Sequence, residues 1–311
     1  MSQTVLVKRL LLLLFSCFLY ISSLAQSSIE KLFNRGYHYI SVDREQAINY
    51  LTQCIEKDST FTKAFFHRGI CFFKNGDYNN ALEDFKTAYR LNPENNVIWM
   101  YQGFTYRNMG QMEKALSSFS NYISLHPQDT SAYSYILRGK MKYELGDFTG
   151  AVEDYDMALR LKPFEEKYEY YRFVALYNSE KYPQALKAAN RLTRINPDFY
   201  GYYFYKGNVF SKMNQPDSAI FMYNIAIIKN YNNSDSYFYR AQAYQQKREY
   251  TKALEDYATA IMLNNDDGSY YSMRGNCRYE MNDKAGACAD WEEAGGLGYY
   301  EDFDKVKKVC E

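Results

Sequence analysis

A unit of about 34 residues repeats along almost the whole chain of 311 residues. The copy that begins at Thr62 carries glycine, aromatic residues, alanine and proline in a set order: Gly69, Phe72, Ala81, Phe85, Ala88 and Pro93. The same order returns as Gly103, Tyr106, Ala115, Phe119 and Pro127, and again as Gly139, Ala151, Tyr155, Ala158 and Pro163. A fixed period of this size is typical of a solenoid, in which each unit packs only on its neighbours.

Eight copies are present between Ser28 and about Gly298. Each copy has one small position in its first helix, occupied in chain order by Gly36, Gly69, Gly103, Gly139, Phe173, Gly207, Ala241 and Gly275. Each also has an alanine in its second helix: Ala47, Ala81, Ala115, Ala151, Ala185, Ala219, Ala253 and Ala287. A missing side chain at such a position lets two helices approach closely. We therefore expect the fifth pair to be the least regular, because Phe173 is bulky.

The pattern resembles the tetratricopeptide repeat (TPR) family, whose unit is a helix, a turn and a second helix. Trp99, Gly103, Tyr106, Ala115, Phe119 and Pro127 match its motif at the right spacing, and Gln102 departs from it where leucine is usual. The resemblance implies an all-α fold without strands, a right-handed superhelical solenoid of about eight units over residues 26–298. A C-terminal capping helix over 299–311 is expected to shield the last unit.

The first 25 residues are typical of a secretory signal peptide. Lys8 and Arg9 precede an apolar run from Leu10 to Ile21, and Ser23, Leu24 and Ala25 offer a cleavage point before Gln26. Two alternatives stay open, an uncleaved anchor helix and a lipoprotein attached through Cys17. We expect an exported protein, periplasmic or associated with the cell envelope, without a transmembrane segment once the signal is removed.

Charge and catalytic motifs exclude several function classes. The net charge is zero, and removal of the signal leaves a chain of charge −2, without the basic face that nucleic acid requires. The histidines His38, His67 and His126 have no partners at catalytic or metal-binding spacing, and no phosphate-binding loop or nucleophile elbow occurs. We therefore expect no enzyme, no cofactor and no metal site.

Arginine and aspartate recur together in four copies. Arginine stands one residue before the small position, and aspartate follows it after 16 residues, in the pairs Arg68 and Asp84, Arg138 and Asp154, Arg240 and Asp256, and Arg274 and Asp290. Copies that lack the aspartate carry Tyr50, Ser118, Ala188 or Met222 there, and two of them also lack the arginine. We expect a structural ion pair across each helix pair. Two independent solvated charges are the alternative.

The resemblance implies that ligands lie in the concave groove lined by the first helices. The residues three before the small positions form a mostly aromatic ladder: Phe33, Phe66, Met100, Ile136, Tyr170, Phe204 and Phe238. Other expected groove residues are Phe73, Tyr143, Tyr177, Asn208, Gln242, Gln245 and Asn276. Exposed apolar stripes mark interaction sites, although the ladder can instead pack between adjacent repeats.

The sequence thus predicts a non-catalytic scaffold that binds a protein or peptide partner of unknown identity, as an assembly or adaptor factor. A subunit that binds or positions a glycan or another polymer on the same aromatic groove is the alternative, because tyrosine and phenylalanine also stack on sugars. No lysine stands three before any small position, which argues against the carboxylate clamp that the resemblance would otherwise suggest.

Three cysteines lie near the C-terminus. Cys288 lies near the start of its helix, which approaches the ends of both neighbouring helices, where Cys277 and Cys310 lie. A disulfide of Cys288 with Cys310 is favoured because it would staple the capping helix, and an exported protein meets an oxidising compartment. Pairing of Cys277 with Cys288, or free thiols throughout, are the alternatives.

Overall fold

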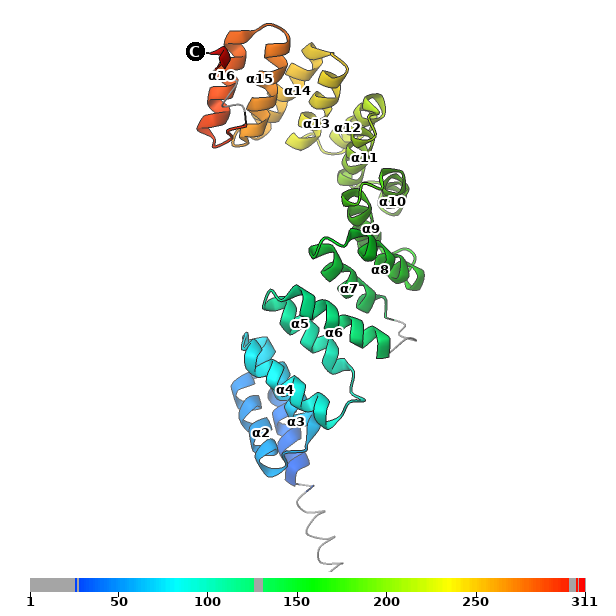
Figure 1. Ribbon diagram of the computed structural model, residues 1–311, viewed down its shortest axis with the longest axis vertical. Helices are drawn as coiled ribbons and strands as arrows, with labels where there is room; N and C mark the ends of the chain where they lie inside the picture. Colours follow the sequence, from blue (N-terminus) through cyan, green and yellow to red (C-terminus); the bar gives the residue numbers. More distant parts are fainter. Residues whose placement is uncertain (1–25, 27, 126–130, 302–305, 307, 311) are drawn as a thin grey trace, which may run out of the picture. The chain divides into compact units, whose positions relative to one another are not determined.

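A computed structural model describes residues 26, 28–125, 131–301, 306 and 308–310 (Figure 1). These residues are helical apart from short connections, and no β-strand occurs among them, which confirms the all-α prediction. The expected signal peptide at 1–25, including Lys8, Arg9 and Cys17, lies outside the described residues, as does His126. The chain divides into two compact units, Met1–Gly146 and Asp147–Glu311, which we describe separately.

Unit 1 holds the first three copies and the first helix of the fourth. Residues 28–39 are helical and pack against α2, and the later helices follow in order. The helices are α2 (Arg44–Lys57), α3 (Thr62–Asn75), α4 (Tyr78–Leu91), α5 (Val97–Asn108), α6 (Met112–Leu125) and α7 (Ala132–Glu144). Within the unit, each helix packs on the next one along the chain.

Unit 2 begins with the second helix of the fourth copy and continues through the last four pairs. Its helices are α8 (Phe148–Leu161), α9 (Glu166–Asn178), α10 (Tyr182–Ile195), α11 (Tyr200–Lys212), α12 (Pro216–Lys229), α13 (Ser234–Gln246), α14 (Tyr250–Leu263), α15 (Gly268–Glu280) and α16 (Lys284–Gly296). The first helices also contact one another across pairs, α11 with α13 and α13 with α15.

Local sequence sets where these helices begin and end. Aspartate and asparagine side chains cap several helix starts by accepting backbone N–H bonds, as Asp77 does from Asn80. The helices α4, α8 and α10 end at Leu91, Leu161 and Ile195, each two residues before a proline, which cannot continue a helix.

One turn position takes a left-handed backbone in every copy from the second on. In the earlier copies it is glycine, at Gly76, Gly110 and Gly146, with φ of 82°, 74° and 82°. In the last four it is Glu180, Asn214, Arg248 and Asn282, with φ of 58°, 57°, 60° and 65°. A side chain disfavours this backbone conformation, so the turns of unit 2 are locally strained.

The small position packs against an aromatic ring 16 residues later in the second helix. A Cβ added at Gly103 would lie 2.6 Å from the Phe119 ring, and one added at Gly69 would lie 2.7 Å from Phe85. Tyr223 and Trp291 fill the same place opposite Gly207 and Gly275. At these four positions the ring occupies the space that a side chain would need, which favours glycine there.

In the fifth pair the bulky residue stands at the small position of the first helix, and a small residue stands at the ring position of the second helix. Phe173 occupies the small position, and Ala189 stands where the other second helices of unit 2 carry a ring. Both are buried, with exposed fractions of 4% and 0%. The helices α9 and α10 have 13 and 14 residues, like α11 and α12, so the irregularity expected of this pair does not appear in its helix lengths.

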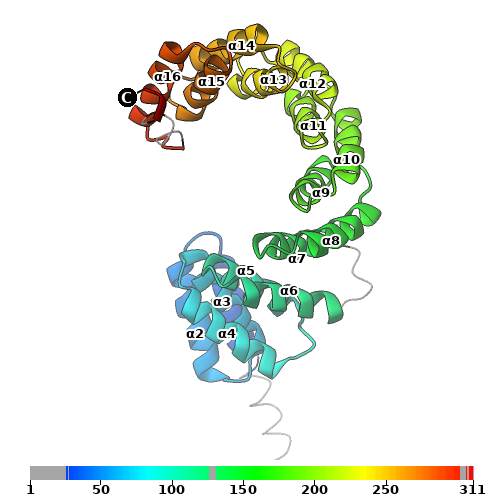
Figure 2. The same ribbon diagram turned by 45° about the horizontal axis from the view of Figure 1, so that its top comes forward.

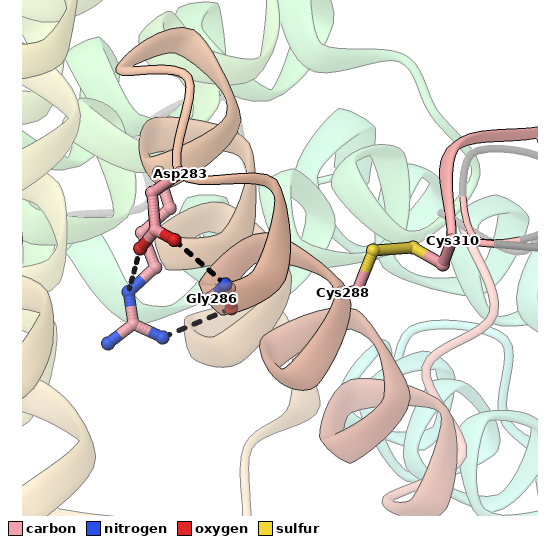
Figure 3. Close-up of a disulfide and its surroundings, with 5 residues drawn as sticks. Asp283, Gly286, Cys288 and Cys310 are labelled. Atoms are coloured by element: carbon pink, nitrogen blue, oxygen red, sulfur yellow. Dashed lines mark hydrogen bonds and ion pairs between the residues drawn. A yellow bond between two sulfur atoms is a disulfide. The ribbon is translucent and has the colours of Figure 1, made fainter.

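The C-terminal segment is attached to the last helix pair by a disulfide (Figure 3). Cys288 of α16 is bonded to Cys310, with their Cα atoms 5.8 Å apart. Val306, Lys308 and Val309 are helical, and the Cys310 N–H bonds to the Val306 carbonyl. Residues 299–301 of the expected capping helix are not helical, and residues 302–305, 307 and 311 lie outside the described residues. Cys54, Cys71 and Cys277 are buried free thiols.

Candidate partner-binding surface

Within unit 2 the first helices of the pairs lie together on one side. Figure 2 shows α9, α11, α13 and α15 along the inner edge of the unit, with α10, α12, α14 and α16 behind them. This arrangement follows from the contacts of α11 with α13 and of α13 with α15. Side chains on the free face of these first helices therefore form the candidate partner-binding surface, which we call the groove face.

The aromatic ladder is only partly free to bind. The ring three residues before each small position packs on the ring two residues before the next one. Phe66 lies 5.3 Å from Tyr101, and Phe204 lies 5.4 Å from Tyr239, measured between ring centroids. Phe33 with His67 and Tyr170 with Tyr205 repeat the contact at 5.4 and 5.7 Å. The ladder thus serves packing between adjacent pairs as well as the groove face.

Two ladder residues are too buried to meet a partner. Ile136 and Phe238 have exposed fractions of only 2% and 7%. Phe238 packs against Tyr270 of the next pair, with ring centroids 4.6 Å apart. Neither side chain is exposed to a partner in this structure, and for Phe238 the ring of the next pair provides the cover. The other expected groove residues are half-buried: Phe33, Phe66, Phe73, Met100, Tyr143, Tyr170, Tyr177, Phe204, Asn208, Gln242, Gln245 and Asn276.

The most exposed rings of the groove side were not all singled out by the sequence. Tyr37 is 57% exposed, Tyr279 42% and Tyr239 37%. Tyr239 occupies the position two before the small one, which the sequence analysis did not count as groove-lining. Its signal was present, because rings or His67 recur at that register in the second, third, fifth, sixth and seventh copies.

Buried tyrosines hold the polar side chains of the groove face in place. The Tyr223 hydroxyl donates to Asn208 Oδ1 at 2.8 Å, and the Tyr257 hydroxyl donates to Gln245 Oε1 at 2.8 Å. Burial raises the pKa of both tyrosines above the ordinary value of 10.0, so both hydroxyls stay protonated and donate. The two amides therefore present their NH₂ groups outward, and Gln245 Nε2 reaches Glu280 at 3.3 Å.

A pocket of about 700 Å³ lies on the groove face at the end of the array. Met273 and Trp291 provide an apolar floor, and the Tyr279 ring lies 5.6 Å from Trp291. The remaining walls carry polar and C-terminal side chains, from Gln245, Asn276, Glu280, Lys308 and Val309. The disulfide between Cys288 and Cys310 attaches the segment that supplies Lys308 and Val309. A smaller hollow of about 160 Å³ lies farther along the face between Tyr177, Tyr205 and Asn208.

In unit 1, His67 lies within an aromatic cluster. Its ring is 5.0 Å from Tyr37 and 5.4 Å from Phe33, between centroids. Burial, with a smaller contribution from Lys63, lowers the pKa of His67 to about 4. The histidine is therefore neutral at physiological pH and serves as a packing residue.

Three of the expected arginine–aspartate pairs are present as paired hydrogen bonds. Arg68 bonds Asp84 at 2.8 and 2.8 Å, Arg240 bonds Asp256 at 2.7 and 2.6 Å, and Arg274 bonds Asp290 at 3.0 and 2.6 Å. The aspartates are buried. Arg138 and Asp154 belong to different units, and their pairing stays a prediction.

Some arginines at this position also donate hydrogen bonds to a residue 16 positions earlier, in the preceding pair. The sequence analysis did not predict these bonds. Arg68 Nη1 donates to Thr52 at 3.0 Å and Arg240 Nη1 donates to Asn224 at 2.6 Å, each 16 residues earlier. In the fifth pair Arg172 donates to Asp156 at 2.5 Å across the same interval. Arg68 and Arg240 therefore join consecutive pairs as well as the two helices of their own pair, whereas Arg172 joins α9 to α8 of the preceding pair.

Two further observations concern metal ligands and membrane-spanning helices in the described residues. Within them, no cluster of histidine, cysteine, aspartate and glutamate is arranged to hold a metal ion. Among the described helices none has the length and apolar character needed to cross a membrane.

Comparison with known proteins agrees with this geometry. Three segments, residues 62–95, 98–129 and 234–267, match models of the family "Tetratricopeptide repeat". Anaphase-promoting complex subunit 3 of Schizosaccharomyces pombe is 26% identical over 194 residues, covering 60% of this chain and 28% of that protein. The chain thus spans less than a third of this relative's length.

Two solved structures share the fold. The C-terminal part of a TPR repeat-containing protein from Cytophaga hutchinsonii has a TM-score of 0.64 at 18% identity, covering 75% of this chain and 95% of that one. A tetratricopeptide repeat protein from Parabacteroides merdae has a TM-score of 0.57 at 20% identity, covering 80% and 99%. At these identities the likeness concerns the fold alone.

Proposed function

Since this chain is a tetratricopeptide-repeat protein, we propose that it is a non-catalytic scaffold that holds an extended peptide segment of a partner protein on the groove face of unit 2. Repeat proteins of this family are in general protein-binding scaffolds rather than catalysts. In this proposal the protein is an assembly or adaptor factor at the cell envelope.

The pocket beside Tyr279 is the observation that carries the proposal. An extended peptide offers alternating side chains and unpaired backbone N–H and C=O groups. Met273 and Trp291 provide apolar contact for a side chain, and the polar side chains of Gln245 and Asn276 line the same pocket. Aromatic and methionine side chains with a polar rim are the usual make-up of a binding surface.

The packing of the rings favours a peptide over a glycan. Sugar binding requires a free aromatic face, on which the apolar side of the sugar lies. The rings of Phe204 and Tyr170 pack instead against the rings of Tyr239 and Tyr205 of the next pair. Among the groove-side rings that the structure describes, the glycan-binding alternative rests on the more exposed ones, Tyr37, Tyr239 and Tyr279.

The similarity to a subunit of a larger complex also supports a role in assembly. The Schizosaccharomyces pombe relative is by name a subunit of the anaphase-promoting complex. Because this chain matches only part of it, the similarity supports the general role of a scaffold and not any particular complex.

We further propose that the protein is exported, with residues 1–25 as a signal peptide, to the periplasm or the cell envelope. The disulfide between Cys288 and Cys310 supports this location, since such bonds persist in oxidising compartments. Attachment as a lipoprotein through Cys17 is less favoured, because it would leave apolar residues such as Phe18 and Leu19 at the mature N-terminus. Cell fractionation with an antibody against the mature chain tests the location.

Affinity purification from the native host tests the binding surface. We expect Tyr279→Ala to reduce recovery of the partner about tenfold, since buried aromatic anchors dominate interfaces. Phe221→Ala, on the exposed side of α12, is the matched control and should leave recovery unchanged. Equal recovery with both variants would contradict the proposal.

A further inference from the structure

The residue four before the small position is aromatic in most copies. It is Phe65, Trp99, Tyr135, Tyr203, Tyr237 and Tyr271 in six of the eight, and Leu32 in the first. In four of them the guanidinium of the arginine one before the small position lies over this ring. Its Cζ is 5.7 Å from the Phe65 centroid in Arg68, 5.8 Å from Tyr135 in Arg138, 5.5 Å from Tyr237 in Arg240 and 5.6 Å from Tyr271 in Arg274.

The fifth copy carries Glu169 at this position, and a pocket of about 660 Å³ opens beside it. The pocket lies between the end of α8, the start of α9 and the end of α10, and Leu159, Phe164 and Ile195 supply its apolar walls. Phe164 is 85% exposed. The position that carries a ring in six other copies thus carries a carboxylate here, with a pocket beside it.

Glu169 lies buried at the pocket, with an exposed fraction of 1%. Its carboxylate accepts a hydrogen bond from Arg172 Nη1 at 3.2 Å and lies 3.6 Å from Arg191 Nη1. Arg172 also pairs with Asp156, whereas Arg191 pairs with Glu169 and remains 62% exposed on the pocket wall. The glutamate holds Arg191 at the opening of the pocket.

The pocket also borders the most basic second helix of the array. The helix α10 carries Lys187, Arg191 and Arg194 and no acidic residue. Every other second helix has at least one aspartate or glutamate. Arg191 and Arg194 both line the pocket, and both are exposed. Its opening is therefore complementary to negative charge.

We propose that this pocket is a second binding site, which takes one aromatic side chain from an acidic segment of a partner protein. In this proposal the partner's ring lies between Leu159, Phe164 and Ile195, beside the position that carries a ring in six other copies. Carboxylates beside it pair with Arg191 and Arg194. None of the groove-face residues lines this pocket, so the site is independent of the groove face.

A short acidic peptide with one central tyrosine tests the proposal. The probe is the capped pentapeptide acetyl-Asp-Glu-Tyr-Glu-Asp-amide, with a fluorescent label on a flexible linker, titrated onto the mature protein at low salt. We expect binding in roughly the 0.1–1 mM range, as befits one anchor and a few exposed charges. We also expect the affinity to fall at least tenfold when the tyrosine of the probe is replaced by alanine.

Variants of the protein separate this site from general charge attraction. Glu169→Tyr places a ring of the protein itself at the pocket and should weaken binding of the probe at least tenfold. The control Glu255→Tyr, at an exposed position of α14, should leave binding unchanged. Arg194→Glu alters only an exposed charge and should weaken binding several-fold even if Glu169→Tyr folds poorly. Absence of binding to the native protein at 5 mM probe (roughly the weakest affinity that this site allows) would overturn the proposal. So would equal binding of the alanine probe, or native affinity in a folded Glu169→Tyr protein.

Discussion

Arg240 is held by Asp256 through two parallel hydrogen bonds, from Nε to Oδ2 at 2.7 Å and from Nη2 to Oδ1 at 2.6 Å. Its third donor group, Nη1, bonds Asn224 of the preceding pair at 2.6 Å. One arginine thus ties together α12, α13 and α14. The same geometry at Arg68, with Asp84 and Thr52, makes this a recurring joint of the array.

Removing the carboxylate of this joint should destabilise the protein strongly. The side chains of Arg240 and Asp256 are 18% and 9% exposed, so Asp256→Ala leaves a largely buried guanidinium without its main partner. We expect a loss of about 3 kcal/mol in the free energy of unfolding, measured by urea denaturation. The exposed neighbour Glu255→Ala should change it by less than about 0.5 kcal/mol. A similarly small loss of stability in Asp256→Ala and Glu255→Ala would show that this joint does not stabilise the protein.

The exchange of Phe173 and Ala189 should appear as strong coupling between the two positions. Phe173→Gly removes a buried ring and should cost about 3–5 kcal/mol, and Ala189→Phe overpacks the pair at a cost of at least 1–3 kcal/mol. The double variant restores the glycine–ring arrangement of other pairs and should be several kcal/mol more stable than the sum predicts. The free energies of unfolding of the native protein, the two single variants and the double variant measure this coupling. If the two single changes simply add up in the double variant, the two side chains do not share one space.

The buried His67 should make unit 1 sensitive to acid. Its pKa of about 4 lies below the ordinary value of 6.5, so between these values the unfolded chain binds a proton that the folded chain does not. Stability is therefore present above about pH 6.5 and is lost as pH falls toward 4. From pH 7 to pH 5 we expect a loss of about 2 kcal/mol from this group.

The variant His67→Phe isolates this contribution from that of other titrating groups. Fluorescence of Trp99 in a Trp291→Phe background reports on unit 1 alone, because these are the two tryptophans of the chain. The histidine protein should lose more stability between pH 7 and pH 5 than the phenylalanine protein. An equal loss in both proteins would show that His67 is not the sensitive group.

Relief of backbone strain should stabilise unit 2. Arg248 has φ of 60°, in the left-handed region that glycine tolerates and other residues disfavour. Arg248→Gly should raise the free energy of unfolding by about 1 kcal/mol, because the second and third copies already use glycine at this turn. Arg248→Ala keeps the Cβ atom and should bring no such gain, so equal gains from both would point to the arginine charge instead.

The helical repeat, the ion pairs and the disulfide could be predicted because each depends on neighbouring helices of one or two copies. Arg240 and Asp256 stand 16 residues apart, an interval that any helix pair of this length repeats. Cys288 and Cys310 were one of two plausible pairings, and the position of the last segment decided between them.

Burial of the ladder could not be predicted, because it depends on the angle between successive pairs. Phe238 and Ile136 looked like groove residues by register, yet the following pair covers Phe238 with Tyr270. The pocket at Glu169 did have a signal in the sequence. The glutamate interrupts a register that is aromatic in six other copies, but only the structure shows the pocket beside it.

Site-specific photo-crosslinking tests the central claim, that a partner peptide lies on the groove face of unit 2, most directly. A benzophenone amino acid replaces Tyr279 in one protein and Phe221 in another, so that each change exchanges an exposed ring for a reactive ring. Both proteins are irradiated in the native host. The protein with the benzophenone at position 279 should form a discrete crosslinked species, and the protein with it at position 221 should not. A crosslink from 221 alone, or the same species from both, would contradict the groove face as the binding surface.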